Sequence, residues 1–349
     1  MSSELKKQLA ELDRQIEEMK AAGNRAAQAA LHGQKALLYA LARDMRSAAL
    51  EIAQAGVLAE EDGQYEQLAQ AHLAKGKALL NQPGQRKVAR GSLQKAEALY
   101  HTLENRPRQI ETLKELAALD GASGDFESAA GRLSQAIALL SDGDEPELSI
   151  ELYRLRARAH MLRRDLETAL ADLDTALDAA QKLGDDGLAL EIRVEQMTVR
   201  SLQSEKMSPD EMATLLQEAQ QSGNMGAVAD VQLQRATESF QAGEYRQALE
   251  QVRAARRAAR DGTDLERHLR YLMASLLMSD VWERLGDRAE SLAALLTCKV
   301  YLETHLGPEM GRAMDTLLDG LEQRWGRDGL AEAVRLYKQR VRERGPYQV

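Results

Sequence analysis

The sequence predicts an all-α protein built as a series of helical hairpins. Three observations support this prediction: a residue pattern that recurs about every forty residues, a shortage of bulky aromatic core residues, and short turns at regular positions. Only 4% of the 349 residues are aromatic, although 44% are hydrophobic. Alanine and leucine supply most of the apolar content, which suits helices that pack closely on small side chains.

The recurring pattern is a residue that is small in most copies, an apolar residue four positions later and another small residue three positions after that. Offsets of four and three place the three side chains on one face of a helix. Near-constant spacing over eight copies indicates a repeat of seven to eight units, with the last one degraded. The copies begin at Ala48, Ala89, Ala129, Ala169, Met212, Ala248, Ser291 and Leu330.

Each copy is expected in the second helix of a hairpin, because a short turn precedes it. Turns such as SGDF at 123–126, AGEY at 242–245 and LGDR at 285–288 combine glycine with an acidic residue. Glycine ends a helix, and an acidic residue favours the start of the next one. Ser208 and Glu211 flank a proline in the arrangement of a capping box, which indicates a further helix start.

Two copies carry a fuller signature of a turn glycine, a bulky residue and then the small–large–small pattern. This signature resembles the tetratricopeptide repeat, and the resemblance spans roughly residues 24–344. The usual repeat has 34 residues, so a period near forty is more similar to the longer-helix repeats of kinesin light chains and bacterial regulators. The signature residues are Gly124, Phe126, Ala129, Leu133 and Ala136 in one copy, and Gly243, Tyr245, Ala248, Val252 and Ala255 in the other.

The resemblance implies a right-handed superhelix of paired helices with capping helices at both ends. The chain departs from the family pattern at Asp120 and Ser239, where a Tyr or Leu is common. We expect three regions: an N-terminal capping or coiled-coil helix at 1–22, the repeat array at 23–306, and a degenerate repeat with a capping helix at 307–349.

The N-terminal helix carries an apolar seam at heptad spacing. Such a seam suits either a cap on the first repeat or a coiled-coil dimer through residues 4–21. Two heptads are short for a coiled coil, so a cap and a monomer are favoured. The seam residues are Leu5, Leu9, Leu12, Ile16 and Met19.

Charge and composition exclude several classes of partner. The formal net charge is −9, which disfavours unspecific binding to nucleic acid or anionic lipid. Cys298 is the only cysteine, so an internal disulfide and a thiolate zinc site are excluded. The start of the chain lacks the features of a secretory signal and no run approaches eighteen apolar residues, so we expect a cytoplasmic protein without membrane insertion.

No catalytic, cofactor or metal motif is present. The six histidines are scattered, and there is no phosphate-binding G-x-x-x-x-G-K or dinucleotide-binding G-x-G-x-x-G. Cys298 falls at the small position of its repeat, where a cysteine packs as a small hydrophobe. The sequence therefore predicts a protein that is not an enzyme and has no cofactor.

The resemblance implies a concave surface lined by the first helix of each hairpin, which would bind an extended peptide or a helix of a partner protein. Lys114, Arg154 and Arg158 would form a positive spot there, suited to an acidic segment. The carboxylate clamp of chaperone-binding relatives is absent, since Gly33 and Leu37 occupy its positions. The expected concave-face residues are Gln34, Leu37, Lys114, Ala118, Arg154, Arg158, Leu233 and Thr237.

A second basic surface is a stripe of arginines on one helix, at offsets of three, four and seven. The stripe comprises Arg253, Arg256, Arg257 and Arg260. It is either a solvated outer face or a grip for a phosphate or an acidic partner through forked donors.

The function predicted from the sequence is that of a scaffold or adaptor that binds a partner protein. The alternative is a peptide-sensing regulatory module that changes conformation when its ligand binds. Such regulators usually carry a DNA-binding or effector domain, and residues 1–60 show no basic helix-turn-helix.

Overall fold

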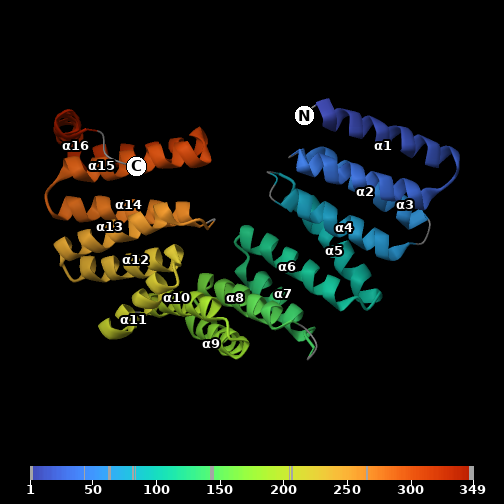
Figure 1. Ribbon diagram of the computed structural model, residues 1–349, viewed down its shortest axis with the longest axis horizontal. Coiled ribbons are helices and arrows are strands. Elements are labelled where there is room, and N and C mark those ends of the chain that lie inside the picture. Colours follow the sequence, from blue (N-terminus) through green and yellow to red (C-terminus); the bar gives the residue numbers. More distant parts are fainter. Residues whose placement is uncertain are drawn as a thin grey trace. The chain divides into compact units, whose positions relative to one another are not determined.

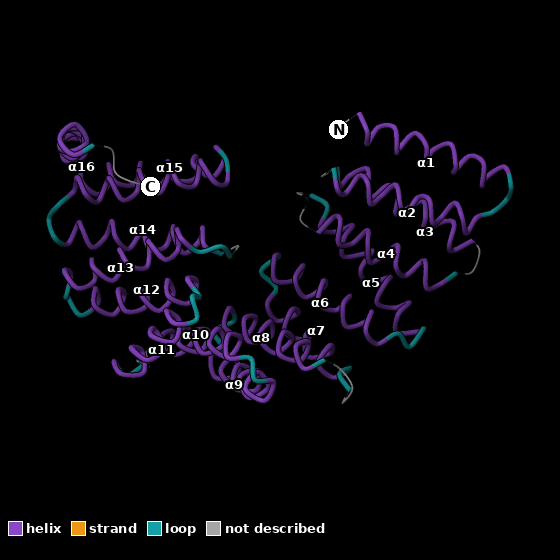
Figure 2. Tube along the Cα trace, viewed as in Figure 1, coloured by secondary structure: helices purple, strands orange, loops and turns teal. Residues whose placement is uncertain are grey.

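The chain forms a series of helices, with no strand among the residues that the structure describes (Figures 1 and 2). The structure is a computed structural model. It describes residues 3–42, 44–61, 64–80, 82, 84–141, 145–203, 205, 207–264 and 266–345. The chain divides into two compact units, Met1–Leu183 and Gly184–Val349.

The first unit contains one leading helix followed by four helical hairpins. The helices are α1 (Ser3–Ala21), α2 (Arg25–Leu41), α3 (Met45–Glu61), α4 (Tyr65–Leu80), α5 (Arg86–Thr102), α6 (Arg106–Ala122), α7 (Phe126–Ala138), α8 (Pro146–Leu162) and α9 (Leu166–Leu183). Each even-numbered helix pairs with the helix that follows it.

The second unit contains three hairpins and a long terminal helix. Its helices are α10 (Asp186–Leu202), α11 (Pro209–Gln221), α12 (Met225–Gln241), α13 (Tyr245–Asp261), α14 (Arg267–Arg284), α15 (Arg288–Leu306) and α16 (Pro308–Arg344). The prediction of an all-α array of seven to eight helical hairpins with terminal helices is therefore confirmed.

The small residues of the repeat pattern lie between the helices of a hairpin. Ala89, Ala129, Ala169 and Ala248 are all buried. A short side chain at these positions lets the two helices approach closely. Larger residues of the same core, such as the fully buried Leu93, fill the remaining space between the helices. Every predicted copy from Ala48 to Ser291 begins in the second helix of a pair, as expected.

The turns follow the same local rule at each hairpin. Gly124, Gly243 and Gly286 have positive φ angles of 79°, 81° and 83°, which glycine adopts without strain. Arg164 takes the same position in its hairpin with φ 66°. The Asp125 side chain accepts a hydrogen bond from the Ser128 backbone N–H at 3.1 Å and caps the next helix.

Asp120, at which the sequence departs from the tetratricopeptide pattern that it resembles, is fully buried. Its carboxylate accepts a hydrogen bond from Arg132 Nε of α7 at 2.6 Å and one from Arg90 of α5. One carboxylate on α6 therefore ties together the helices before and after it, and the two arginines compensate for its burial. Asp172 of α9 is paired in a similar way with Arg156 of α8 at 2.6 Å.

The terminal helices pack against their neighbouring hairpins. In α1, Leu9 and Ile16 of the predicted seam are buried within the chain, where α1 contacts α2. The α16 helix breaks at Gly326, whose φ of 71° and ψ of 169° are not helical. Beyond the break, Leu330, Val334 and Tyr337 of the degraded repeat pack against the hydrophobic core of the second unit.

Replacing Ala129 with leucine should overpack the contact between α6 and α7. We expect the free energy of unfolding to fall by about 1–3 kcal/mol. The measurement is urea unfolding followed by circular dichroism. Ala118→Leu is the matched control, because Ala118 lies on α6 but is exposed. Equal stability of the two variants would contradict the repeat frame.

Because the seam of α1 is already used inside the chain, the protein should be a monomer. Static light scattering of the full chain should give the monomer mass of 38.6 kDa. Leu9→Glu should lower the melting temperature without changing that mass. A particle of twice the mass that Leu9→Glu converts to monomer would favour the coiled-coil dimer instead.

Candidate functional site: an arginine-lined pocket

A pocket of about 290 Å³ opens between α13, α14 and α15 of the second unit. The predicted arginine stripe of α13 forms one wall, and apolar and aromatic side chains of the other two helices complete it. The lining residues are Arg253, Arg256, Arg257 and Arg260 of α13, Tyr271, Met278 and Trp282 of α14, and Glu290, Ala293, Ala294 and Thr297 of α15.

The sequence of α13 explains why its arginines share a wall. Ala248, Val252, Ala255 and Ala259 are buried and fix the face of the helix that packs into the core. The arginines at 253–260 are then directed to another face, since their offsets of three, four and seven keep them together. The stripe is therefore not only a solvated face, because it meets α14 and α15 across a hollow.

Arg256 is anchored by a buried tyrosine. Its Nη2 donates a hydrogen bond to the Tyr271 hydroxyl at 2.6 Å, and its guanidinium carbon lies 4.7 Å from the centre of the Tyr271 ring. Burial raises the pKa of Tyr271, with Arg256 acting in the opposite direction. Tyr271 stacks in turn on Tyr301 of α15, with ring centres 3.8 Å apart. The position of this guanidinium is thus held by two packed rings.

Arg253 and Arg257 lie one helical turn apart and are exposed. The guanidinium carbon of Arg253 is 5.3 Å from the centre of the Trp282 ring, a cation–π contact. Within the described residues, no carboxylate forms an ion pair with Arg253, Arg256 or Arg257. Among the described residues, three positive charges of this pocket therefore have no carboxylate as an ion-pair partner.

The acidic groups at the pocket are engaged elsewhere. Arg260 Nε contacts the Asp261 carboxylate at 3.0 Å. Glu290 lines the pocket, but Arg340 of α16 donates a hydrogen bond to its carboxylate at 2.9 Å and also pairs with Asp287. The terminal helix thereby partly neutralises the one carboxylate that lines the arginine pocket.

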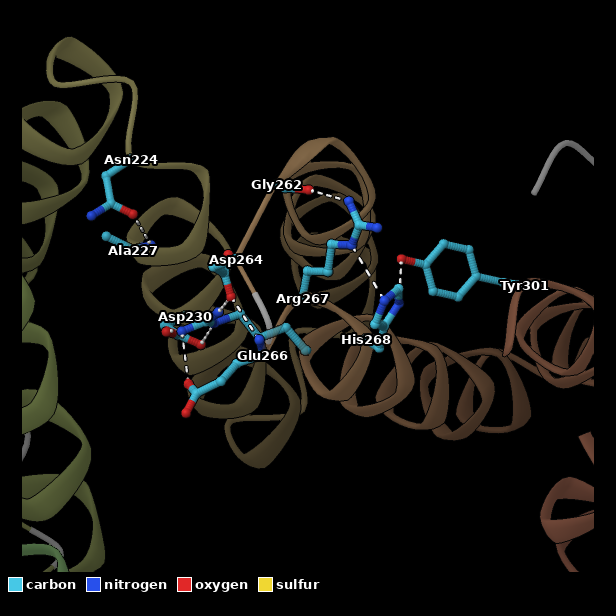
Figure 3. A network of polar contacts seen from close by, with 10 residues as sticks. Asn224, Ala227, Asp230, Gly262, Asp264, Glu266, Arg267, His268 and Tyr301 are labelled. Carbon is cyan, nitrogen blue, oxygen red and sulfur yellow. Dashed lines mark hydrogen bonds and ion pairs between the residues drawn. The ribbon is translucent and has the colours of Figure 1, made fainter. Parts of the chain in front are cut away.

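A second polar network joins α12 and α14 nearby (Figure 3). Arg270 Nε donates to both carboxylate oxygens of Asp230, at 2.8 and 2.9 Å, and the same guanidinium contacts Asp264 and Glu266. Burial raises the pKa of Asp230 to about 6 although Arg270 opposes the shift. In the same view, His268 is hydrogen-bonded to the Tyr301 hydroxyl at 3.1 Å.

The raised pKa of Asp230 makes stability depend on pH. In the unfolded chain an aspartate titrates near about 3.9, so between about pH 4 and 6 the folded protein holds a proton that the unfolded chain has lost. The contribution of Asp230 to stability should therefore fall as the pH rises through this window. Asp230→Asn removes this titration, so the variant should gain about 1–3 kcal/mol relative to wild type between pH 4 and 7. Urea unfolding at several pH values measures the difference, and a constant difference would contradict the raised pKa.

The predicted first-helix residues are spread over both units. Gln34, Leu37 and Ala118 are exposed on α2 and α6. Lys114 Nζ is ion-paired with Glu151 of α8 at 2.5 Å, so it lies beside a carboxylate of the same chain.

The remaining predicted residues lie on α8 and α12. Arg158 is exposed and Arg154 is half-buried on α8. On α12, Leu233 packs against the core, and the Thr237 hydroxyl donates to the Leu233 carbonyl at 2.9 Å. Their role in partner binding stays a prediction.

Other chemistry is sparse in the part of the chain that the structure describes. No group of three or more His, Cys, Asp or Glu side chains there could hold a metal ion. Cys298 is fully buried, as predicted, and burial raises the pKa of its thiol. No described helix is both long enough and apolar enough to span a bilayer.

Sequence reasoning missed the aromatic part of the pocket. Tyr271 and Trp282 belong to the next hairpin, and only the packing of α13 on α14 brings them to the arginine stripe. A signal was available, because tyrosine and tryptophan are rare in this chain and these two stand on one helix at an offset of eleven, about three turns.

Comparisons with known proteins give distant likenesses in structure. No protein-family model matches the chain, and no curated protein matches it. The solved structures similar to it include BtubC (BKLC) from P. vanneervenii, with 14% identity, a TM-score of 0.47, and coverage of 72% of this chain and 92% of that one. Aspartyl phosphate phosphatase F from Bacillus subtilis has 16% identity and a TM-score of 0.46, covering 72% of this chain and 68% of that one.

A third similar structure is the apo form of the quorum sensor NprR from B. thuringiensis. It has 12% identity and a TM-score of 0.46, and the match covers 90% of this chain and 83% of that one. At such distances none of these proteins carries its function over to this chain.

Proposed function

We propose that this protein is a non-enzymatic interaction module that holds an acidic segment of a partner protein in the arginine pocket. One observation carries the proposal: Arg253, Arg256 and Arg257 line one pocket, and no described carboxylate neutralises them. We further propose that its hairpins are repeats of the tetratricopeptide type. This second proposal is supported by the buried small residues and by the glycine turns of the repeat frame.

The surroundings of the arginines favour an acidic protein segment. Met278, Ala293 and Ala294 form a buried apolar floor, and charges beside such a surface interact more strongly than charges in water. The whole chain carries a net charge of −9. A long polyanion is therefore repelled at a distance, while a short acidic segment is attracted locally.

The predicted face of the first helices is a second docking surface for the same function. Arg154 and Arg158 on α8 stay candidates there, and each already interacts with another group of the chain, as Lys114 does with Glu151. The pocket has the stronger support, because it is concave and, within the described residues, no carboxylate forms an ion pair with Arg253, Arg256 or Arg257.

The test compares three full-length variants with the wild type. The pocket variant is Arg253→Ala with Arg256→Ala and Arg257→Ala. The first-helix variant is Arg154→Ala with Arg158→Ala. The matched control removes three exposed cations from α16 by Arg335→Ala, Lys338→Ala and Arg342→Ala. Circular dichroism checks that all variants retain their helicity.

Proteins captured by each form are identified by mass spectrometry, and the partner is then purified for titration calorimetry. Each charge-assisted hydrogen bond lost should cost about 1.5–3 kcal/mol, so the pocket variant should bind at least about tenfold more weakly than wild type and the control. If the first-helix variant loses the partner and the pocket variant keeps it, the docking surface is the face of the first helices. Undiminished binding by both variants would contradict the proposal.

A further inference from the structure

We infer that the arginine pocket recognises a phosphorylated side chain of the partner segment. This inference rests on the proposed function and names the chemical group that the pocket takes. It follows from three properties of the cations in the pocket: their number, their residue type and the aromatic contacts that hold two of them in place.

The number of cations exceeds what a carboxylate can neutralise. A carboxylate carries one negative charge and two oxygens, so it would leave two of Arg253, Arg256 and Arg257 without a counter-ion. A phosphorylated side chain carries a charge of about −1.5 to −2 at pH 7 and three strong acceptor oxygens. It therefore offers one acceptor oxygen for each of the three guanidinium groups that line the pocket.

The type of cation fits phosphate as well. All four basic residues that line the pocket are arginines. The planar fork of a guanidinium binds two phosphate oxygens in parallel, whereas a lysine ammonium acts as a point charge.

Two of the cations are fixed before any ligand arrives. Arg256 is held by the Tyr271 hydroxyl at 2.6 Å, and Arg253 lies over the Trp282 ring. Side chains that are already ordered lose less conformational entropy on binding. Arg257 is exposed like Arg253, but no aromatic ring contact holds it within the described residues.

The pH dependence of binding between pH 5.5 and 7.5 should report the charge of the ligand and not that of the pocket. Neither histidine nor lysine lines the pocket, and the groups that face it are the four arginines, Tyr271 and Glu290, which Arg340 holds. The second pKa of a phosphate ester is about 6. Binding should therefore weaken as the pH falls from 7.5 to 5.5, because the ligand loses a charge, whereas a carboxylate ligand stays ionised over this range.

The experiment measures binding of fluorescent peptide libraries to the full chain. Each library has one central residue between identical randomised positions, and the central residue is phosphoserine, phosphotyrosine, serine or aspartate. We expect one of the phosphorylated libraries to bind at least tenfold more tightly than the aspartate library, and inorganic phosphate to compete. This binding should be lost in the pocket variant, kept in the α16 control variant and weakened several-fold at pH 5.5. Arg257→Lys should retain only part of it.

The outcomes separate this inference from the proposed function. Equal binding of aspartate and phosphorylated libraries, lost in the pocket variant, would overturn the phosphate inference and leave the proposed function standing. Binding that the pocket variant retains, or no binding of any library, would overturn the inference. If the pocket variant binds the captured partner as tightly as the wild type does, the proposed function itself is overturned. Tighter binding of a single-stranded RNA oligonucleotide than of the phosphorylated libraries would also overturn the inference.

Discussion

The close contact of two helices over small side chains is the constraint on which the rest of the structure depends. Ala89, Ala129, Ala169 and Ala248 are all buried, and in a close-packed interior a larger side chain at such a position must displace its neighbours. Gly76 of α4 shows how tight the contact is, because a Cβ atom there would lie only 2.4 Å from a Leu93 methyl carbon. Once one face of a second helix is fixed in this way, the direction of its other faces is fixed too. The arginine wall of the pocket is a consequence of that constraint on α13.

Much of the fold could be predicted because it is local. A turn glycine or aspartate and the small residues of the next helix lie within a few residues of each other in the sequence. The hairpins can therefore be predicted from the sequence alone. The carboxylate of Asp120 is different. Its partners Arg90 and Arg132 come from the helices on either side, and what appears in the sequence as a departure from the repeat pattern is a buried ion pair.

Only the arginines of the candidate site could be predicted from the sequence, and not its aromatic residues. The spacing of Arg253, Arg256, Arg257 and Arg260 placed them together on one helix face, but a single helix cannot distinguish a solvated stripe from the wall of a pocket. That difference is made by Tyr271 and Trp282, which reach the stripe only through the packing of one hairpin on the next. Such contacts join residues of consecutive hairpins, and their separation along the sequence varies with the length of the loops. A periodic sequence pattern therefore does not predict them.

The chain treats its arginines in two different ways. In the first unit, Arg90, Arg132 and Arg156 neutralise buried aspartates between helices, and they are part of the packing. In the second unit, Arg253, Arg256 and Arg257 contact aromatic rings or solvent in place of carboxylates. The second unit also contains arginines of the first kind, since Arg270 pairs with Asp230 and Arg340 pairs with Asp287. Arginine therefore stabilises helix packing in both units, whereas at the pocket it is available to a ligand.

The contact of Arg340 with Glu290 gives the terminal helix a share in the electrostatics of the pocket. When α16 is docked, the carboxylate beside the arginines is partly neutralised, so an anion meets less repulsion there. Thermodynamic reciprocity then requires that an anion in the pocket strengthen the docking of α16 by the same free energy. The last helix of the array is thus energetically linked to a pocket whose cations all lie on α13.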